Sequence, residues 1–238
     1  MCKNDIKWKK YLYYMKSFQN ENRIELGIDE AGRGCLFGSL FVAGVILPNN
    51  FSELIEEHKI TIKDSKKMSK KKRIISEEFI KKNVLSYAII EVTSDVIDIK
   101  NILKSTLDGM HEVVRQIATR PDKILVDGNK FNDYVDEIGS IEHECVIGGD
   151  DTYLSIACAS ILAKTAKDAY IERMVEEKPE LEKYYLRNNS GYGTKKHIDA
   201  IQEFGISEYH RKTFGICNGV RKEKRNIKKI VQNCDLFK

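Results

Sequence analysis

The sequence predicts an α/β fold, because short apolar strands alternate with helical segments and two of the strands end in acids. Residues 24–28 and 123–126 are short runs rich in β-branched and leucyl side chains. Each run leads directly into an aspartate, Asp29 or Asp127, and then a glycine-containing turn. Such runs are typical of buried strands. Ligand sites of α/β sheets gather at the carboxyl ends of central strands, so both acids are candidate site residues.

The sequence of the first half of the core predicts four strands and one long helix. Residues 40–47 are too β-branched and too short for a helix, and residues 84–92 form another apolar run, so the chain begins with a hairpin-like series of strands. Residues 97–119 carry apolar side chains at helical spacing and end before a proline. This helix and the 123–126 strand form a β-α-β step, which favours parallel pairing of that strand with the first strand.

The second half is predicted to be mostly helical. Residues 151–173 are rich in small and apolar side chains and should form a long packed helix. Residues 188–193 consist mainly of turn-forming residues and predict a loop. A helix over residues 195–203 follows and ends at Gly205.

The length of 238 residues suits one large domain, or one domain with a small appendage. We expect a polar lead-in over residues 1–23, a core domain over 24–215 whose last part is helical, and a basic tail over 216–238. No stretch approaches the roughly 20 apolar residues of a membrane span, and no apolar segment follows the charged start, so we expect a cytoplasmic protein without a membrane partner. The six cysteines form no Cys-x-x-Cys pair and no zinc spacing, which indicates reduced thiols.

The net charge is only +4, but the basic residues are bunched at positions 66–73, 210–212 and 221–225. Clusters of this kind fit contact with a polyanionic backbone. In the first cluster, Lys66 is the candidate phosphate contact. The chain is rich in Lys, Ile and Asn throughout, so a solvated surface explains each cluster equally well.

Four acids are candidate metal ligands. If their strands are parallel neighbours, Asp29 and Asp127 repel each other unless a cation separates them. Asp168 lies on the apolar stripe of the 151–173 helix, where a carboxylate needs a metal or an ion pair, and Lys164, four residues earlier, is the alternative partner. Glu30 joins the group if the chain turns after it, although an Asp-Glu pair before glycine is also an ordinary turn.

Carboxylates without His or Cys ligands select Mg²⁺ or Mn²⁺, and a pair of such ions about 4 Å apart is common in displacement at phosphorus. The Gly-Arg-Gly loop, which consists of Gly32, Arg33 and Gly34, combines close backbone approach with a planar cation and suggests a phosphodiester substrate. A dinucleotide fingerprint is excluded, because the glycine spacing differs and a strand follows. Tyr192, between two glycines, is placed to stack on a sugar or base, or is simply a loop aromatic.

Six segments resemble, in order, the motifs of type 2 ribonuclease H, ribonuclease HII. They lie at residues 27–34, 64–67, 126–128, 155–168, 190–194 and 210–214, so the resemblance spans about residues 24–215. Cys35 and Ser39 depart from the family pattern, in which proline is common at both positions. These departures affect loop stiffness and leave the four acids unchanged.

The resemblance implies a ribonuclease H-like mixed sheet flanked by helices, with a helical carboxyl-terminal region. It implies hydrolysis of the RNA strand of RNA–DNA hybrids and incision 5′ of ribonucleotides embedded in duplex DNA, giving 3′-hydroxyl and 5′-phosphate ends by two-metal-ion catalysis. By position it makes Asp29, Glu30, Asp127 and Asp168 the metal-binding acids. It makes the Gly-Arg-Gly loop the sensor of the 2′-hydroxyl, which distinguishes RNA from DNA, and Tyr192 the ring that packs on the next deoxyribose. We expect a monomer without a protein partner.

Two other functions compete with this interpretation. A non-catalytic nucleic-acid-binding module would be expected to lack at least one of the acids, and all four are present. A two-metal nuclease acting on DNA only, such as a resolvase-like enzyme, would have no use for the Gly-Arg-Gly loop.

Overall fold

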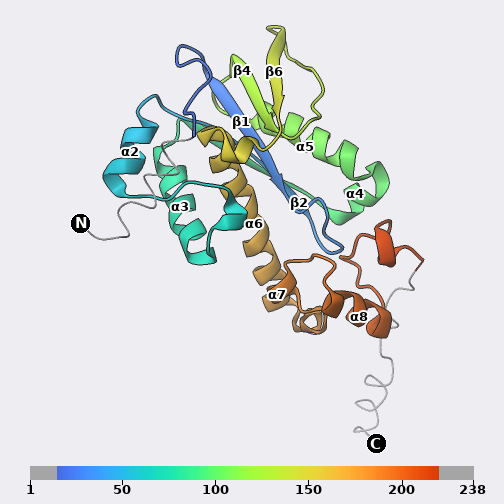
Figure 1. Cartoon of the computed structure of the whole chain (residues 1–238). Coiled ribbons are helices and arrows are strands. Elements are labelled where there is room, and N and C mark those ends of the chain that lie inside the picture. Colours follow the sequence, from blue (N-terminus) through green and yellow to red (C-terminus); the bar gives the residue numbers. More distant parts are fainter. Residues whose placement is uncertain (1–14, 220–238) are drawn as a thin grey trace, which may run out of the picture.

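The computed structural model describes residues 15–219 and shows a six-stranded mixed sheet with helices on both faces (Figure 1). The strand order is β3-β2-β1-β4-β6-β5. The strands are β1 (Glu25–Ala31), β2 (Leu40–Ile46), β3 (Ser86–Val92), β4 (Lys123–Asp127), β5 (Tyr134–Val135) and β6 (Ser140–Val146). The pairing of β1 with β4 is parallel, which confirms the predicted β-α-β step, and β1–β2 and β2–β3 are antiparallel.

The helices surround the sheet and build a separate carboxyl-terminal part. The α-helices are α2 (Phe51–His58), α3 (Lys70–Asn83), α4 (Ser94–Lys100), α5 (Ile102–Gln116), α6 (Leu154–Glu177), α7 (Leu186–Asn189) and α8 (Lys195–Phe204). The 3-10 turns are η1 (Ser65–Lys67), η2 (Gly149–Asp151), η3 (Pro179–Tyr184) and η4 (Gly215–Cys217). The predicted strands, the long helix α6 and the helix α8 are confirmed within a few residues.

Three features differ from the sequence expectation. The predicted helix over residues 97–119 is two helices, because Asn101 adopts a positive φ of 66° and caps α5 by accepting a hydrogen bond from the Lys104 backbone. Helices α2 and α3 lie between β2 and β3, which therefore do not form a tight hairpin. The sequence predicts no element for residues 129–150, where the structure has β5 and β6, because the β6 sequence, Ser-Ile-Glu-His-Glu-Cys-Val, is too polar to resemble a buried strand.

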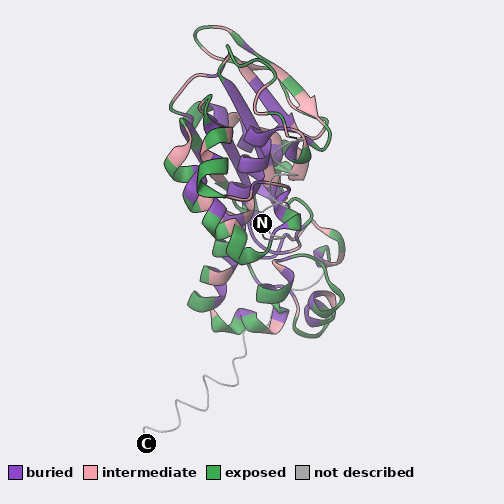
Figure 2. Cartoon of the chain, turned by 60° about the vertical axis from the view of Figure 1, so that its left-hand side comes forward, coloured by how far each residue is buried: buried purple, intermediate pink, exposed green. Residues whose placement is uncertain are grey.

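Alternate residues of the central strands face two separate cores. Ala43 and Val45 face the core built with α2, α3 and α6, whereas Leu26, Ile28 and Val42 face the core built with α5. Figure 2 shows the buried strands between helices whose outer surfaces are exposed. This period of two is what a sheet covered on both faces requires.

Helix α6 begins against β1 and runs from the sheet to the carboxyl-terminal part (Figure 1). Gly27 permits this approach, because a Cβ there would lie 2.4 Å from the Ser155 backbone carbon. The basic cluster at 210–212 does not form a cationic surface. His210 and Arg211 are fully buried, and Lys212 pairs with Asp95 at 2.8 Å. The expected phosphate contact rested on the composition of that cluster alone, and these burial and ion-pair contacts contradict it.

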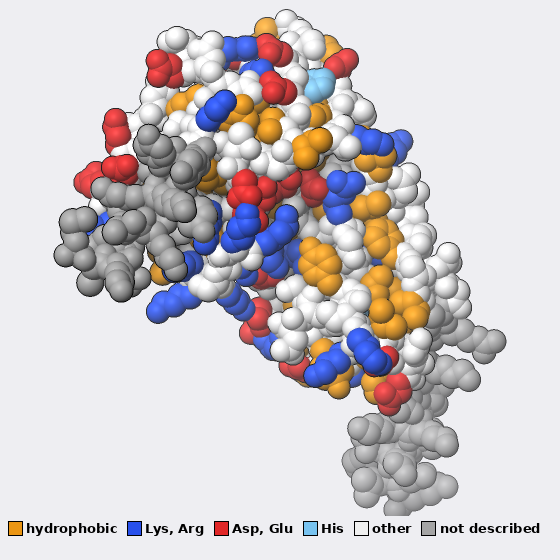
Figure 3. Space-filling view, viewed as in Figure 1, with side chains coloured by type: hydrophobic (Ala, Val, Ile, Leu, Met, Phe, Trp, Pro, Cys, Tyr) orange, Lys and Arg blue, Asp and Glu red, His pale blue; other side chains and the backbone are white. Residues whose placement is uncertain are grey.

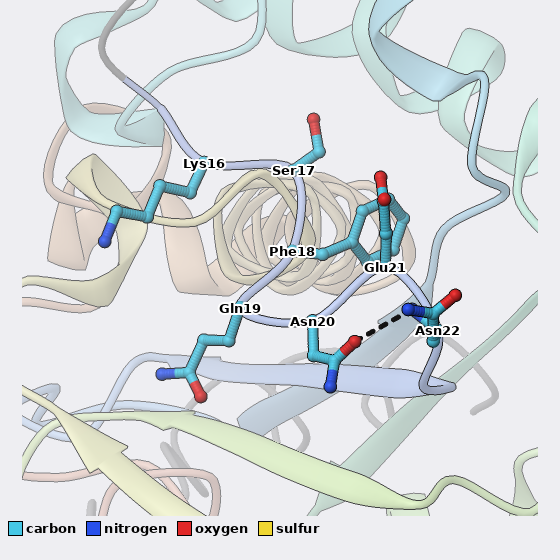
Figure 4. A pocket seen from close by; sticks show the side chains of 7 residues that line it. All are labelled: Lys16, Ser17, Phe18, Gln19, Asn20, Glu21 and Asn22. Carbon is cyan, nitrogen blue, oxygen red and sulfur yellow. Dashed lines mark hydrogen bonds between the residues drawn. The ribbon is translucent and has the colours of Figure 1, made fainter.

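The described end of the lead-in packs on the core. Lys16 forms a bridge with Tyr153 just before α6, and residues 16–22 line a surface pocket over that end of the helix (Figure 4). The predicted tail and the basic cluster at 221–225 lie outside the described residues, except for positions 216–219. Four cysteines, at 35, 145, 158 and 217, are described, and all are free. Within residues 15–219 no helix has the length and apolarity needed to cross a membrane.

Candidate active site

Asp29 and Asp127 lie side by side at the carboxyl ends of the central strands β1 and β4. Ile28 pairs with Val126 in the parallel register of β1 and β4, so the next residue of each strand is the aspartate. Asp29 is only 4% exposed. Burial raises its pKa well above the usual range, and the charges of Glu30 and Asp127 raise it further. The two acids are therefore close enough to disfavour each other's ionisation.

Glu30 joins this pair although β1 continues through it to Ala31. Burial raises the pKa of Glu30 and the charge of Asp127 adds to the effect, while Arg33, 3.2 Å away, opposes it. The second carboxylate oxygen of Glu30 is buried and has no hydrogen-bond partner. This oxygen is available to bind a ligand such as a metal ion, because no group of the described residues donates to it.

Asp150 is a further acid at the same edge, which the sequence interpretation missed. It lies in η2, immediately after β6, and β6 pairs in parallel with β4. The backbone N–H of Gly149 donates to Asp127 Oδ1 at 2.8 Å, which fixes η2 against β4. Burial raises the pKa of Asp150, and the charges of Asp127 and Asp64 raise it further. Recognition of β6 as a parallel strand would have pointed to the acid at its carboxyl end.

Asp168 has different neighbours. It accepts hydrogen bonds from Arg73 on α3 at 2.9 Å and from Lys164 at 2.6 Å. Burial raises the pKa of Asp168, but these two cations outweigh burial and hold the pKa below its usual value. The structure therefore realises the alternative in which Lys164 pairs with Asp168. It does not bring Asp168 into the group formed by Asp29 and Asp127.

Lys66 lies beside the acids. Its ammonium is 3.9 Å from Asp150, and its side chain remains largely exposed. Burial lowers the pKa of Lys66, but the charges of Asp150 and Asp29 more than offset that effect, so the pKa is raised. Figure 3 shows acidic side chains gathered near the middle of one face, with lysine and arginine side chains directly below them.

The acidic group fits a divalent cation by its chemistry. Asp29, Glu30, Asp127 and Asp150 offer only oxygen ligands, and their mutual repulsion is what a bound cation would relieve. Among the described residues, no three His, Cys, Asp or Glu side chains converge as a ready-made metal cluster. The described part of the chain thus supplies oxygen ligands at one site without arranging them as a ready-made metal cluster.

The Gly-Arg-Gly loop and the Tyr192 loop are joined by backbone contacts. Cys35 and Tyr192 form an antiparallel bridge, and the Leu36 N–H donates to the Gly191 carbonyl at 2.8 Å. Gly32 has a φ of 100°, which favours glycine, and the Arg33 side chain is half-exposed. Tyr192 is 41% exposed, so part of its ring is open to solvent.

Arg211 supports the Gly-Arg-Gly loop from below. Its Nη1 donates to the Arg33 carbonyl at 2.8 Å, and its Nε donates to the Gly38 carbonyl at 2.9 Å. The guanidinium also lies 5.0 Å from the centre of the Phe214 ring, measured from Cζ. The sequence suggested a phosphate contact here, but the side chain binds the protein's own backbone.

The sequence matches the family model of ribonuclease HII over residues 26–217. A ribonuclease HII of Bacteroides thetaiotaomicron is 46% identical over 199 residues, which cover 84% of this chain and 93% of that protein. A ribonuclease HII of Cytophaga hutchinsonii is 43% identical over 199 residues, covering 83% and 92% of the two chains. The chain belongs to the ribonuclease HII family. As a member, it is a metal-dependent nuclease with ribonuclease H activity on RNA–DNA hybrids.

Solved structures of ribonucleases H share this fold. Ribonuclease H2 from Pyrococcus horikoshii has a TM-score of 0.65 at 22% identity, covering 81% of this chain and 94% of that one. RNase HII of Archaeoglobus fulgidus, solved in a complex with PCNA, has a TM-score of 0.62 at 25% identity, covering 85% and 98%. Bst-RNase HIII, solved with Mn²⁺, has a TM-score of 0.61 at 18% identity, covering 87% and 70%. These structures confirm the mixed sheet flanked by helices.

The two positions that depart from the ribonuclease HII pattern have local partners. Cys35 is buried, and its thiol donates to the Ser190 carbonyl at 3.5 Å. Ser39 is also buried, and its hydroxyl donates to Glu91 on β3 at 2.7 Å. Each side chain thus adds a contact that a proline ring could not make, and neither touches the acidic group.

Proposed function

We propose that the enzyme hydrolyses the RNA strand of RNA–DNA hybrids and also incises duplex DNA on the 5′ side of an embedded ribonucleotide, leaving 3′-hydroxyl and 5′-phosphate ends. The observation that carries this proposal is the juxtaposition of the acidic group with the Gly-Arg-Gly loop, which Arg33 joins to Glu30 at 3.2 Å. This contact supports a role for the loop in reading a 2′-hydroxyl beside the acids that would act on the neighbouring phosphodiester.

For the metal ions, we propose that Asp29, Glu30, Asp127 and Asp150 supply the ligands and that Mg²⁺ or Mn²⁺ is bound. Two such ions, when bound, supply an activated water and stabilise the leaving oxygen. The sequence assigned the fourth position to Asp168, and that assignment competes with Asp150. We favour Asp150, because the charge of Asp127 acts on it, whereas Arg73 and Lys164 already neutralise Asp168.

The other site residues bind and orient the nucleic acid. The backbone of Gly32 and Gly34 and the side chain of Arg33 would contact the ribonucleotide, while Tyr192 packs on the deoxyribose beyond the junction. Lys66 is placed to contact a phosphate near the acids, because its ammonium is exposed and close to Asp150. Action as a monomer, without a protein partner, stays a prediction.

The test compares three duplexes of one sequence, containing no ribonucleotide, one ribonucleotide or a complete RNA strand, each with Mg²⁺ or Mn²⁺. We expect cleavage of the last two only, with the single cut 5′ to the ribonucleotide. Direct hydrolysis does not use the 2′-hydroxyl as a nucleophile, so no cyclic phosphate should form. A 2′,3′-cyclic phosphate end would overturn the mechanism. Cleavage of the all-DNA duplex would favour a DNA nuclease instead.

A further inference from the structure

Lys167 is a buried cation that contacts both loops of the proposed recognition surface. It lies on α6 and is 1% exposed. Its ammonium donates a hydrogen bond to the Ser190 carbonyl and lies 4.9 Å from the centre of the Tyr192 ring. Its aliphatic stem passes under Gly32, where an added Cβ would be 2.8 Å from Lys167 Cε.

The partners of this ammonium are unusual for a buried lysine. Within residues 15–219 it forms no ion pair, and its contacts are the Ser190 carbonyl, the Tyr192 ring and the Cys35 side chain. A buried charge costs free energy unless its contacts replace water, and the face of an aromatic ring is one contact that does so. The ammonium therefore restrains the positions of the ring and of the Ser190 carbonyl, and these two groups restrain the ammonium in turn.

The same contacts determine how Tyr192 is presented. The ring has the ammonium on one side, so its remaining exposed surface is the side available to a ligand. Because the stem also fills the space beneath Gly32, a movement of Lys167 would shift the ring and the Gly-Arg-Gly loop together. The side chain thus contacts both loops, in addition to the Cys35–Tyr192 bridge that joins their backbones.

We propose that Lys167 is a positioning residue that sets the distance between the Gly-Arg-Gly loop and the Tyr192 ring, and thereby the preference for an RNA–DNA junction over a uniform hybrid. This inference rests on the proposed function. A uniform hybrid can bind with any of its ribonucleotides at the cleavage site. A duplex with a single embedded ribonucleotide can bind productively in only one position. Misplacing the two loops should therefore harm cleavage at the junction far more than cleavage of the hybrid.

The experiment measures kcat and KM of Lys167→Met on the single-ribonucleotide duplex and on the hybrid. We expect kcat/KM to fall about tenfold on the former, which lies between the effects of an exposed and of a desolvated cation–π contact, and less than about threefold on the latter. Lys167→Arg keeps the cation and should restore most of the preference. If Lys167→Met does not fold, Lys167→Gln replaces it, because its amide keeps a donor for the Ser190 carbonyl.

Two controls separate positioning from general damage. Lys178 also lies over a tyrosine, at 5.1 Å from the Tyr209 ring, but outside both loops, so Lys178→Met should leave both activities unchanged. In a Tyr192→Ala background, Lys167→Met should have little further effect on the single-ribonucleotide duplex, because residues that act together are not additive.

The outcomes are distinguishable. Equal losses on both substrates, full additivity with Tyr192→Ala, or an unchanged preference would each overturn the role of Lys167. If the wild-type enzyme itself does not incise at a single ribonucleotide, the proposed function is wrong, and the positioning role falls with it. Thermal unfolding of each variant shows whether a loss of activity reflects loss of the fold.

Discussion

The two halves of the active site bury charge in opposite ways. The acidic half, at the carboxyl ends of β1, β4 and β6, places carboxylates where burial and mutual repulsion raise their pKa values. In the recognition half, Arg211 and Lys167 are buried; Arg211 donates to the Arg33 and Gly38 carbonyls, and Lys167 donates to the Ser190 carbonyl. The recognition half is therefore stabilised by its own chain, whereas we propose that bound cations complete the acidic half. Variants in the two halves should differ accordingly.

The largest expected effect is in the acidic half, on Asp127→Asn. The amide keeps the volume but loses the charge, so cleavage should fall more than about 100-fold, beyond the loss typical of residues behind the ligands. Without metal, the melting temperature should rise slightly, because repulsion with Asp29 is relieved. Cleavage and thermal unfolding of the same preparation measure both effects. Activity within tenfold of wild type would remove Asp127 from the metal site.

The second prediction separates Asp150 from Asp168. Asp150→Asn should lose metal-dependent activity with little cost in stability. Asp168→Asn should instead lower the free energy of unfolding by about 3 kcal/mol, because Arg73 keeps a mostly buried charge without its carboxylate. Denaturant unfolding and metal titration of both variants provide the comparison. The opposite pattern, with inactive but stable Asp168→Asn, would restore the assignment made from the sequence.

Sequence reasoning succeeded where a residue's role depends on its own strand. Asp29 and Asp127 follow apolar runs typical of buried strands, and the helical segment before β4 predicted the parallel pairing that the structure shows. It failed for Asp150, because β6 carries Glu142 and Glu144 and does not resemble a buried strand. Because β6 was not predicted, the sequence offered no reason to place Asp150 at the carboxyl ends of the strands.

The remaining errors concern partners that are distant in sequence. A helical wheel gives the direction of Asp168 but not its neighbours, and Arg73 comes from α3, a helix that the sequence did not predict. Arg211 occurs in a run of basic residues, and composition alone cannot show that the carbonyls of Arg33 and Gly38 need its donors. Both cases need the three-dimensional fold.

The third prediction concerns two buried histidines beneath the recognition half. The Ser207 N–H donates to His210 Nδ1, so neutral His210 carries its proton on Nε2 and donates to His197 Nε2. His197 then donates from Nδ1 to the Tyr192 carbonyl. Burial and the neighbouring His197 lower the pKa of His210 to about 3. This chain of hydrogen bonds requires both imidazoles to be neutral.

The sign of the pH dependence follows from this lowered pKa. Below about pH 6.5 the unfolded state binds a proton at His210, whereas the folded state does not until about pH 3. Stability is therefore lost as the pH falls through this window, by about 3 kcal/mol between pH 7 and pH 4. This contribution is measured from the free energy of unfolding of the wild type and of His210→Gln at a series of pH values. The free energies of the two proteins should become more similar as the pH falls. A constant difference would show that His210 is not held neutral.

The smallest expected effect is on Tyr192→Ala, which tests the recognition half at its exposed surface. Because the ring supplies stacking and no charge, cleavage at a single ribonucleotide should lose about 1–3 kcal/mol of transition-state stabilisation, while the metal affinity stays unchanged. Tyr192→Phe is the matched control and should retain activity, since it keeps the ring and the Lys167 contact. The measurement is kcat/KM on the single-ribonucleotide duplex with saturating metal. An unaffected Tyr192→Ala would mean that the recognition half does not read the junction through this ring, and a loss of metal affinity would mean that the two halves are not separable.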